Sequence, residues 1–168
     1  MTSADVIVDS FGRIHDIVHR AVDGLTRDDL RARLDSEANS IGWLIWHLTR
    51  IQDDHVAEVA ETEQVWTSAG FANRFGLALD VSDTGYGHTP EQVAAVTVDS
   101  EPLREYFDAV HERTLQFTRG LSDADLDRVV DRRWDPPVTL GVRLVSVVVD
   151  DLLHAGQAAF VRGILERR

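Results

Sequence analysis

Apolar and polar residues follow the 3.6-residue period of an α-helix in four long segments of the chain. In three of them a stripe of apolar residues recurs every three or four positions, with charged residues between. The other segment begins almost entirely apolar at SIGWLIWHL and then becomes amphipathic, as expected for a helix whose first half is buried on most sides. The four predicted long helices span residues 4–25, 40–60, 100–120 and 138–165.

Short capped helices are predicted between the long ones. Thr26 and Asp29 have the spacing of a capping box, with an acid in place of the usual Glu or Gln. Similar short segments follow Thr89 and begin at LSDADLDRVV. Residues 61–100 otherwise lose periodicity and contain several glycines, so they predict a long crossover connection between the second and third long helices. No segment has a convincing strand pattern.

The fold class expected from these elements is all-α, a four-helix bundle formed by residues 1–168 as a single domain. Each half of the chain has the order long helix, short capped helix, long helix, which indicates a weak internal repeat. Aligning Ser40 with Thr139 places His55 opposite His154 in that repeat.

Composition excludes several classes of function. The 168 residues, 43% of them hydrophobic, suffice for one core. A net charge of -12 repels phosphate backbones, so no nucleic acid partner is expected. All 17 bases are arginine, and without lysine there is no Schiff-base chemistry. Neither a leader-like N-terminus nor eighteen uninterrupted apolar residues is present, so we expect a cytoplasmic protein with no membrane partner.

The chain also has no cysteine. Disulfides, cysteine nucleophiles and thiolate-bound zinc are therefore excluded. A metal ion would have to be held by nitrogen and oxygen, and any thiol chemistry would need a thiol from outside the protein.

A candidate metal site lies in the segment VVVDDLLHAGQ near the C-terminus. Asp150 and His154 are four residues apart and so share one face of a helix. His47 is the best-placed third ligand, because it lies in the apolar half of the second long helix, where an unpaired imidazole would be costly to bury. Two histidines and one carboxylate leave open positions on a divalent ion, as in catalytic sites.

Each of these residues could also have a purely structural role, without a metal. His47 could be a core histidine bonded to a backbone carbonyl, and Asp150 or Asp151 a solvated helix residue. Asp151 is about 100° around the helix from Asp150 and is expected to be a bystander. His55 could be a fourth ligand, a general base or part of the solvated run QDDH. The remaining histidines are expected at the surface: His15, His19, His88 and His111.

The motifs WLIWHL around His47 and DDLLHAGQAAFVRG at 150–163 resemble the DinB-like superfamily of metal-binding four-helix bundles. TGYGHTPEQV at 84–93 and WDPPVTLG at 134–141 are similar to the branch related to mycothiol-dependent maleylpyruvate isomerase and mycothiol S-transferases. The resemblance implies the ligand set His47, Asp150 and His154. Asp150 stands where the isomerase has Glu, which leaves direct and water-mediated binding of the metal both open.

The resemblance implies a divalent-metal-dependent S-transferase that activates a low-molecular-weight thiol, mycothiol, for attack on an electrophile. Zinc is the first expectation for the metal, with nickel, iron or manganese as alternatives. Tyr86 and Arg162 are candidates for holding the thiol, against a turn role for Tyr86 and a helix C-terminal charge for Arg162. Exposed apolar helix faces would allow a homodimer.

Two other functions stay open from the residues alone. One is a hydrolase in which a metal-bound water attacks an ester or amide, with His55 as general base. The other is a non-catalytic stress protein that binds a metal without using it.

Overall fold

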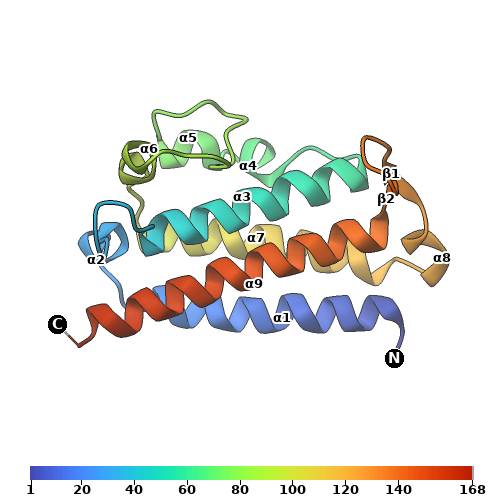
Figure 1. Ribbon diagram of the computed structural model, residues 1–168, viewed down its shortest axis with the longest axis horizontal. Coiled ribbons are helices and arrows are strands. Elements are labelled where there is room, and N and C mark those ends of the chain that lie inside the picture. Colours follow the sequence, from blue (N-terminus) through green and yellow to red (C-terminus); the bar gives the residue numbers. More distant parts are fainter. Residues whose placement is uncertain (168) are drawn as a thin grey trace.

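Four long helices form the bundle in the computed structural model, which describes residues 1–167 (Figure 1). They are α1 (Ser3–Val22), α3 (Ile41–Ala60), α7 (Ser100–Arg119) and α9 (Leu140–Leu165). Helices α3 and α1 each pack against both α7 and α9. The seam between α3 and α9 therefore lies on the opposite side of the bundle from the seam between α1 and α7. The expected all-α fold is confirmed, with the four helices close to their predicted ranges.

The long helix α1 and three of the short helices begin at a Thr or Ser whose side chain accepts a hydrogen bond from the first turn. Capping boxes start α1 at Thr2, α2 at Thr26, α6 at Thr89 and α8 at Ser122. The connection at 61–99 crosses the outer side of α3 (Figure 1). The short helices are α2 (Arg27–Arg31), α4 (Val65–Ser68), α5 (Phe71–Phe75), α6 (Pro90–Ala95) and α8 (Asp123–Leu126).

Two short strands precede α9, where the sequence indicated none. Strand β1 (Val129–Asp131) pairs antiparallel with β2 (Val138–Thr139). Strands of two and three residues are too short to show the alternation by which strands are recognised. Asp131 is buried and forms ion pairs with Arg133 at 2.8 Å and Arg143 at 3.1 Å, so this hairpin is fastened to the first turn of α9.

A buried polar cluster fastens the long connection to the bundle. Arg50 is fully buried, and its guanidinium donates to Asp83 O at 3.1 Å, Gln64 Oε1 at 2.8 Å and Tyr106 Oη at 3.3 Å. Beside it, Asp53 accepts hydrogen bonds from the backbone of α4 and from Tyr106 at 2.9 Å. Burial raises the pKa of Asp53, and its hydrogen bonds and Arg50 only partly oppose that effect. The cluster holds both ends of the segment 64–83 against α3.

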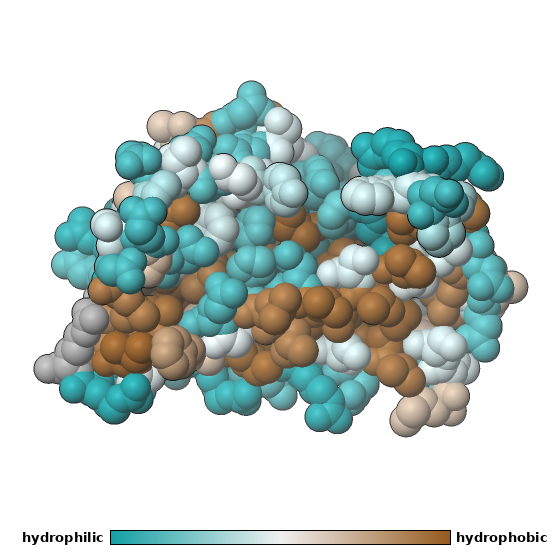
Figure 2. Space-filling view, viewed as in Figure 1, coloured by the Kyte–Doolittle hydropathy of each residue, from teal (hydrophilic) through white to brown (hydrophobic). Residues whose placement is uncertain are grey.

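The outer face of α9 is apolar and exposed, and Figure 2 shows it as a hydrophobic band along the helix. The side chains that make it are Val142, Val145, Val149, Leu152, Leu153 and Phe160. By length and composition alone α9 could cross a membrane. Its opposite face packs against α1 and α3 in the bundle, and its middle carries Asp150 and Asp151. The expected homodimer stays a prediction.

Asp151 is fully buried on the core side of α9, and neither carboxylate oxygen has a hydrogen-bond partner. The solvated position considered for it from the sequence is therefore wrong. Burial, and then the neighbouring Asp150, raise the pKa of Asp151 well above its usual range. This shift favours the protonated form of the carboxyl in the folded protein, whereas the unfolded chain ionises it at pH 7, so folding is penalised at neutral pH.

We expect Asp151→Asn to raise the free energy of unfolding of the metal-free protein at pH 7. The gain should vanish as the pH falls toward the ordinary carboxyl pKa, and grow above that value by at most about 1.4 kcal/mol per pH unit. Urea unfolding of both proteins between pH 4 and pH 8 measures this difference. A variant that is less stable than the parent at pH 7, or a gain that does not change with pH, would contradict a buried neutral carboxyl.

Candidate metal centre

The structure brings together the three residues that the sequence proposed as metal ligands. One ligand atom each from His47 on α3 and from Asp150 and His154 on α9 lie within 4.8 Å of one another. The two imidazole rings are 4.7 Å apart between centroids and meet edge to face. A single divalent ion at the α3–α9 seam can therefore reach all three side chains.

His47 is buried and has one nitrogen committed to the protein. Its Nδ1 donates to the Thr84 carbonyl at 2.5 Å, and its ring stacks on Trp43 at 4.6 Å. Because Nδ1 carries the proton, Nε2 is left with a lone pair for a metal. Burial lowers the pKa of His47, which keeps the ring neutral near pH 7. The carbonyl bond expected of a core histidine is present, and it orients the ring as metal-binding histidines require.

Asp150 and His154 are oriented by their own helix turn. His154 Nδ1 donates to the Asp150 carbonyl oxygen at 2.8 Å, which leaves Nε2 free, and lies 3.3 Å from Asp150 Oδ2. Burial alone would lower the pKa of His154, but its bonds to Asp150 outweigh burial and raise it. Burial likewise would raise the pKa of Asp150, yet the facing histidines lower it, so the carboxylate is ionised.

The environment of one oxygen of the Asp150 carboxylate indicates whether a metal ion fits the site. Asp150 Oδ2 is buried, and within residues 1–167 it accepts no well-formed hydrogen bond: His154 Nδ1 lies 3.3 Å away but donates to the Asp150 carbonyl oxygen. An ionised carboxylate oxygen that is removed from water with so little compensation is costly, and a divalent cation is the partner that would offset this cost. Two imidazoles and one carboxylate also match the ligand types that zinc accepts. The residues present fit a divalent ion.

The connection at 61–99 supplies the surroundings of His47. Asp83 accepts a hydrogen bond from Gly85 N at 2.7 Å and faces His88 Nε2 at 3.0 Å. Trp43 Nε1 donates to His88 Nδ1 at 3.1 Å. The expected surface position of His88 is therefore wrong, since its side chain is only 3% exposed. These bonds fix the turn that presents the Thr84 carbonyl to His47.

Gly85 is the residue of this turn where a side chain does not fit. Its φ is 87°, and a Cβ there would lie 2.9 Å from His47 Nδ1 and 3.0 Å from Trp46 Cζ3. We expect Gly85→Ala to displace the Thr84 carbonyl from His47 and to weaken zinc binding about 10- to 100-fold, the usual cost of a lost outer-shell partner. Competition with a chromophoric chelator measures the affinity.

Gly87→Ala is the matched control for this prediction. Gly87 has a similar φ of 75°, but nothing lies within 4 Å of the position of its Cβ. Both variants carry the backbone strain of a positive φ, and only Gly85→Ala adds the clash with His47. Equal zinc affinities for the two variants would show that this turn does not orient the ligand.

The other predicted site residues lie outside the ligand cluster. His55 Nδ1 faces Arg143 Nη1 at 2.8 Å. Tyr86 is 89% exposed at the tip of the turn. Arg162 donates to the carbonyl oxygens of Arg20 at 2.5 Å and Asp23 at 2.7 Å, so its guanidinium holds the C-terminal end of α1. The roles proposed for these three side chains stay predictions.

The chain is a four-helix bundle in which two imidazoles and a carboxylate converge at one seam, and four-helix bundles build their metal sites from side chains on facing helices in this way. The chain belongs to the DinB superfamily, whose family model matches residues 11–158. It is also similar to a crystal structure described as the conserved protein of a locus from Enterococcus faecalis. That protein is 27% identical, with a TM-score of 0.93 over 100% of this chain and 99% of that one. A sequence comparison with curated proteins gives no match.

Proposed function

We propose that this protein is a divalent-metal-dependent transferase that activates a low-molecular-weight thiol for attack on an electrophile, with mycothiol as the thiol. The observation that carries the proposal is the buried Asp150 Oδ2, which accepts no well-formed hydrogen bond from residues 1–167, beside two imidazoles whose Nδ1 atoms already donate to backbone carbonyls. Three protein ligands leave a position open for a further ligand, as catalytic sites require. The branch of the superfamily and the identity of the thiol rest on the resemblance of TGYGHTPEQV and WDPPVTLG.

A divalent ion bound here would supply Lewis acidity that favours the deprotonated form of a thiol sulfur. The protein's part is to hold the three ligands and to accommodate the electrophile. Overall, a carbon–sulfur bond forms, the leaving group departs with its electron pair, and the thiol proton goes to solvent. The absence of cysteine means that no thiol of the protein competes for the electrophile.

A shallow apolar groove of about 540 Å³ lies along the outer face of α9, beside Asp150. Asp150 is part of its lining, together with Val145, Val149 and Leu153. A substrate seated in this groove would place its apolar portion against the valines and its reactive carbon toward the metal ligands. We therefore expect the electrophile to be hydrophobic.

The geometry of His55 weighs against the hydrolase alternative. Arg143 donates only, so the 2.8 Å contact with Arg143 Nη1 makes Nδ1 of His55 an acceptor and leaves the proton on Nε2. Burial, and then the charge of Arg143, lower the pKa of His55. His55 would have to leave Arg143 before it could take a proton from water.

A thiol-consumption assay tests the proposed function. Zinc-loaded protein is mixed with 1-chloro-2,4-dinitrobenzene or monochlorobimane and with mycothiol, glutathione or cysteine. We expect thiol-dependent product formation that is fastest with mycothiol and is lost in His154→Ala. Turnover of p-nitrophenyl acetate without any thiol would instead support the hydrolase, and no turnover with either substrate class would overturn the transferase.

A further inference from the structure

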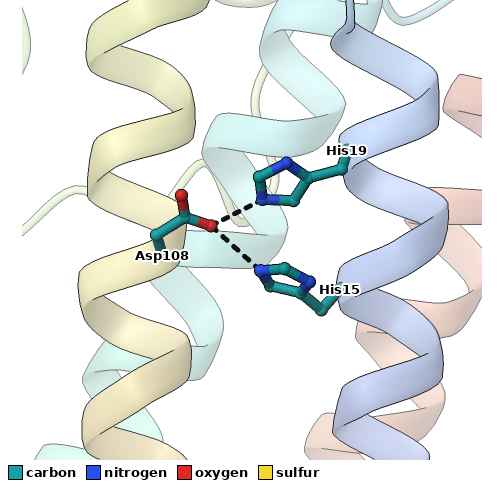
Figure 3. A group of neighbouring side chains, drawn as sticks. All are labelled: His15, His19 and Asp108. Carbon is teal, nitrogen blue, oxygen red and sulfur yellow. Dashed lines mark hydrogen bonds and ion pairs between the residues drawn. The ribbon is translucent and has the colours of Figure 1, made fainter.

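A second cluster of metal-ligand side chains lies at the α1–α7 seam, on the opposite side of the bundle from the first. His15 and His19 of α1 both point toward Asp108 of α7 (Figure 3). Their Nε2 atoms lie 3.1 Å and 2.6 Å from the same oxygen, Asp108 Oδ1. The three ligand atoms lie within 4.8 Å of one another. Among residues 1–167, this group and the His47 group are the two clusters of three or more such side chains.

We propose that His15, His19 and Asp108 form a second divalent-metal site, which joins α1 to α7. The ligand types are those that zinc, nickel and copper prefer, two imidazole nitrogens and a carboxylate oxygen. His15 and His19 are one turn apart, so a single helix presents both rings in a fixed relation before any metal binds. The proposal does not depend on the proposed transferase activity.

The distances in the cluster are close to those of a coordinated ion. Ligand atoms about 2.0–2.1 Å from a tetrahedral ion are about 3.3 Å from each other. The two nitrogen–oxygen separations of 3.1 Å and 2.6 Å require the side chains to part by less than an ångström. No change of the helices is needed, because the three side chains are only partly buried and face one another across the seam.

The surroundings favour a cation. His111, one turn after Asp108 on α7, lies 4.5 Å from His15 between ring centroids, and its buried Nδ1 has no hydrogen-bond partner. Phe107 stacks on His15 at 5.7 Å and supports the ring from the core side. The net charge of -12 also attracts cations to the surface.

The alternative is that the three side chains only hydrogen-bond to one another. Each histidine can donate its Nε2 proton to Asp108, and this arrangement is complete without a metal. The two possibilities differ in the number of zinc ions bound per chain, because three side chains that only hydrogen-bond to one another bind no zinc. Counting bound zinc in matched variants therefore decides between them.

Equilibrium dialysis of tag-free, chelator-treated full-length chain against zinc chloride, followed by elemental analysis, is the test. We expect two zinc ions per chain for the parent protein, one for His19→Ala, one for His154→Ala and none for the double variant. Asp16→Asn is the matched control, since Asp16 adjoins His15 but its carboxylate stays 3.9 Å from that ring, and it should retain two. Circular dichroism of each metal-free variant checks that it is folded.

Two results would overturn the second site. One is a parent protein that binds a single zinc ion which His154→Ala removes. The other is a His19→Ala variant that still binds two. A second readout is thermal unfolding of His154→Ala, in which only the α1–α7 site remains: its midpoint should rise with zinc, and adding His19→Ala should abolish that rise. If the protein bound both zinc ions but showed no transferase activity, the proposal of a site at the α1–α7 seam would still hold.

Discussion

Replacing His154 by alanine should empty the α3–α9 centre. The change removes one of the three candidate ligands, the one whose ring is hydrogen-bonded to the Asp150 carbonyl oxygen. Loss of an outer-shell partner alone costs about 10- to 100-fold in metal affinity, so loss of a direct ligand should cost more than about 100-fold. In a His19→Ala background, the site at the α1–α7 seam does not contribute. There, the zinc content measured by elemental analysis should fall from about one ion per chain to none.

His55→Ala is the control for this experiment. His55 lies two turns beyond His47 on α3 and is bonded to Arg143, outside the ligand cluster. The His55→Ala variant should retain its zinc. If the variant lost its zinc, His55 would instead be a fourth ligand. Stoichiometric zinc retained by His154→Ala would overturn the ligand assignment.

Arg50→Ala should be the most destabilising substitution considered for this fold. The guanidinium is fully buried, donates to three partners on three segments of the chain, and lies 5.1 Å from the ring centroid of Trp66. Truncation leaves Asp53 without its nearest cation and the Asp83 carbonyl without a donor. Breaking a buried charged network in this way costs about 3–5 kcal/mol of unfolding free energy. Urea unfolding with and without zinc measures it.

The loss should extend to the metal centre, because Asp83 immediately precedes Thr84, whose carbonyl orients His47. Zinc affinity should therefore fall together with stability in Arg50→Ala. Arg13→Ala is the matched control, since Arg13 is exposed and pairs only with Asp9 one turn away. If the two arginine variants unfold at the same urea concentration, the buried cluster does not stabilise the connection.

Local chemistry in the sequence was sufficient to place the helices. The capping residues Thr26 and Thr89 begin the short helices as predicted, and the apolar period marks α1, α3, α7 and α9 to within a few residues. Hydrogen bonds within one helix turn depend on neighbouring residues, so a sequence shows them directly. The hairpin before α9 was missed because β1 and β2 pair across the loop at 132–137 and are too short to show a strand period.

The candidate metal ligands were predictable for two different reasons. Asp150 and His154 share one helix face by spacing alone, whereas the pairing of His47 with them rested on its apolar context and on the DinB resemblance. The roles of Thr84 and Gly85 were out of reach, since a carbonyl's partner in a distant helix leaves no pattern in the local sequence. That Asp151 lies outside the ligand set stays a prediction, and its complete burial was not foreseen.

The sequence did contain a signal for the cluster at the α1–α7 seam. His15 and His19 have the same four-residue spacing as Asp150 and His154, yet the charged residues around them favoured a surface position. Charged neighbours in the sequence indicate only which face of a helix is exposed to solvent. The groove between α1 and α7, where Asp108 meets both rings, depends on how two helices far apart in sequence pack.

Each seam joins a helix from the first half of the chain to one from the second half, α3 to α9 and α1 to α7. The halves are linked through the connection at 61–99, whose turn exposes Tyr86 to solvent. A chain cut there would carry an incomplete set of ligands on each fragment. Zinc would then act as the bridge between two polypeptides, and reassociation of the purified fragments would depend on metal concentration in the manner of a heterodimer.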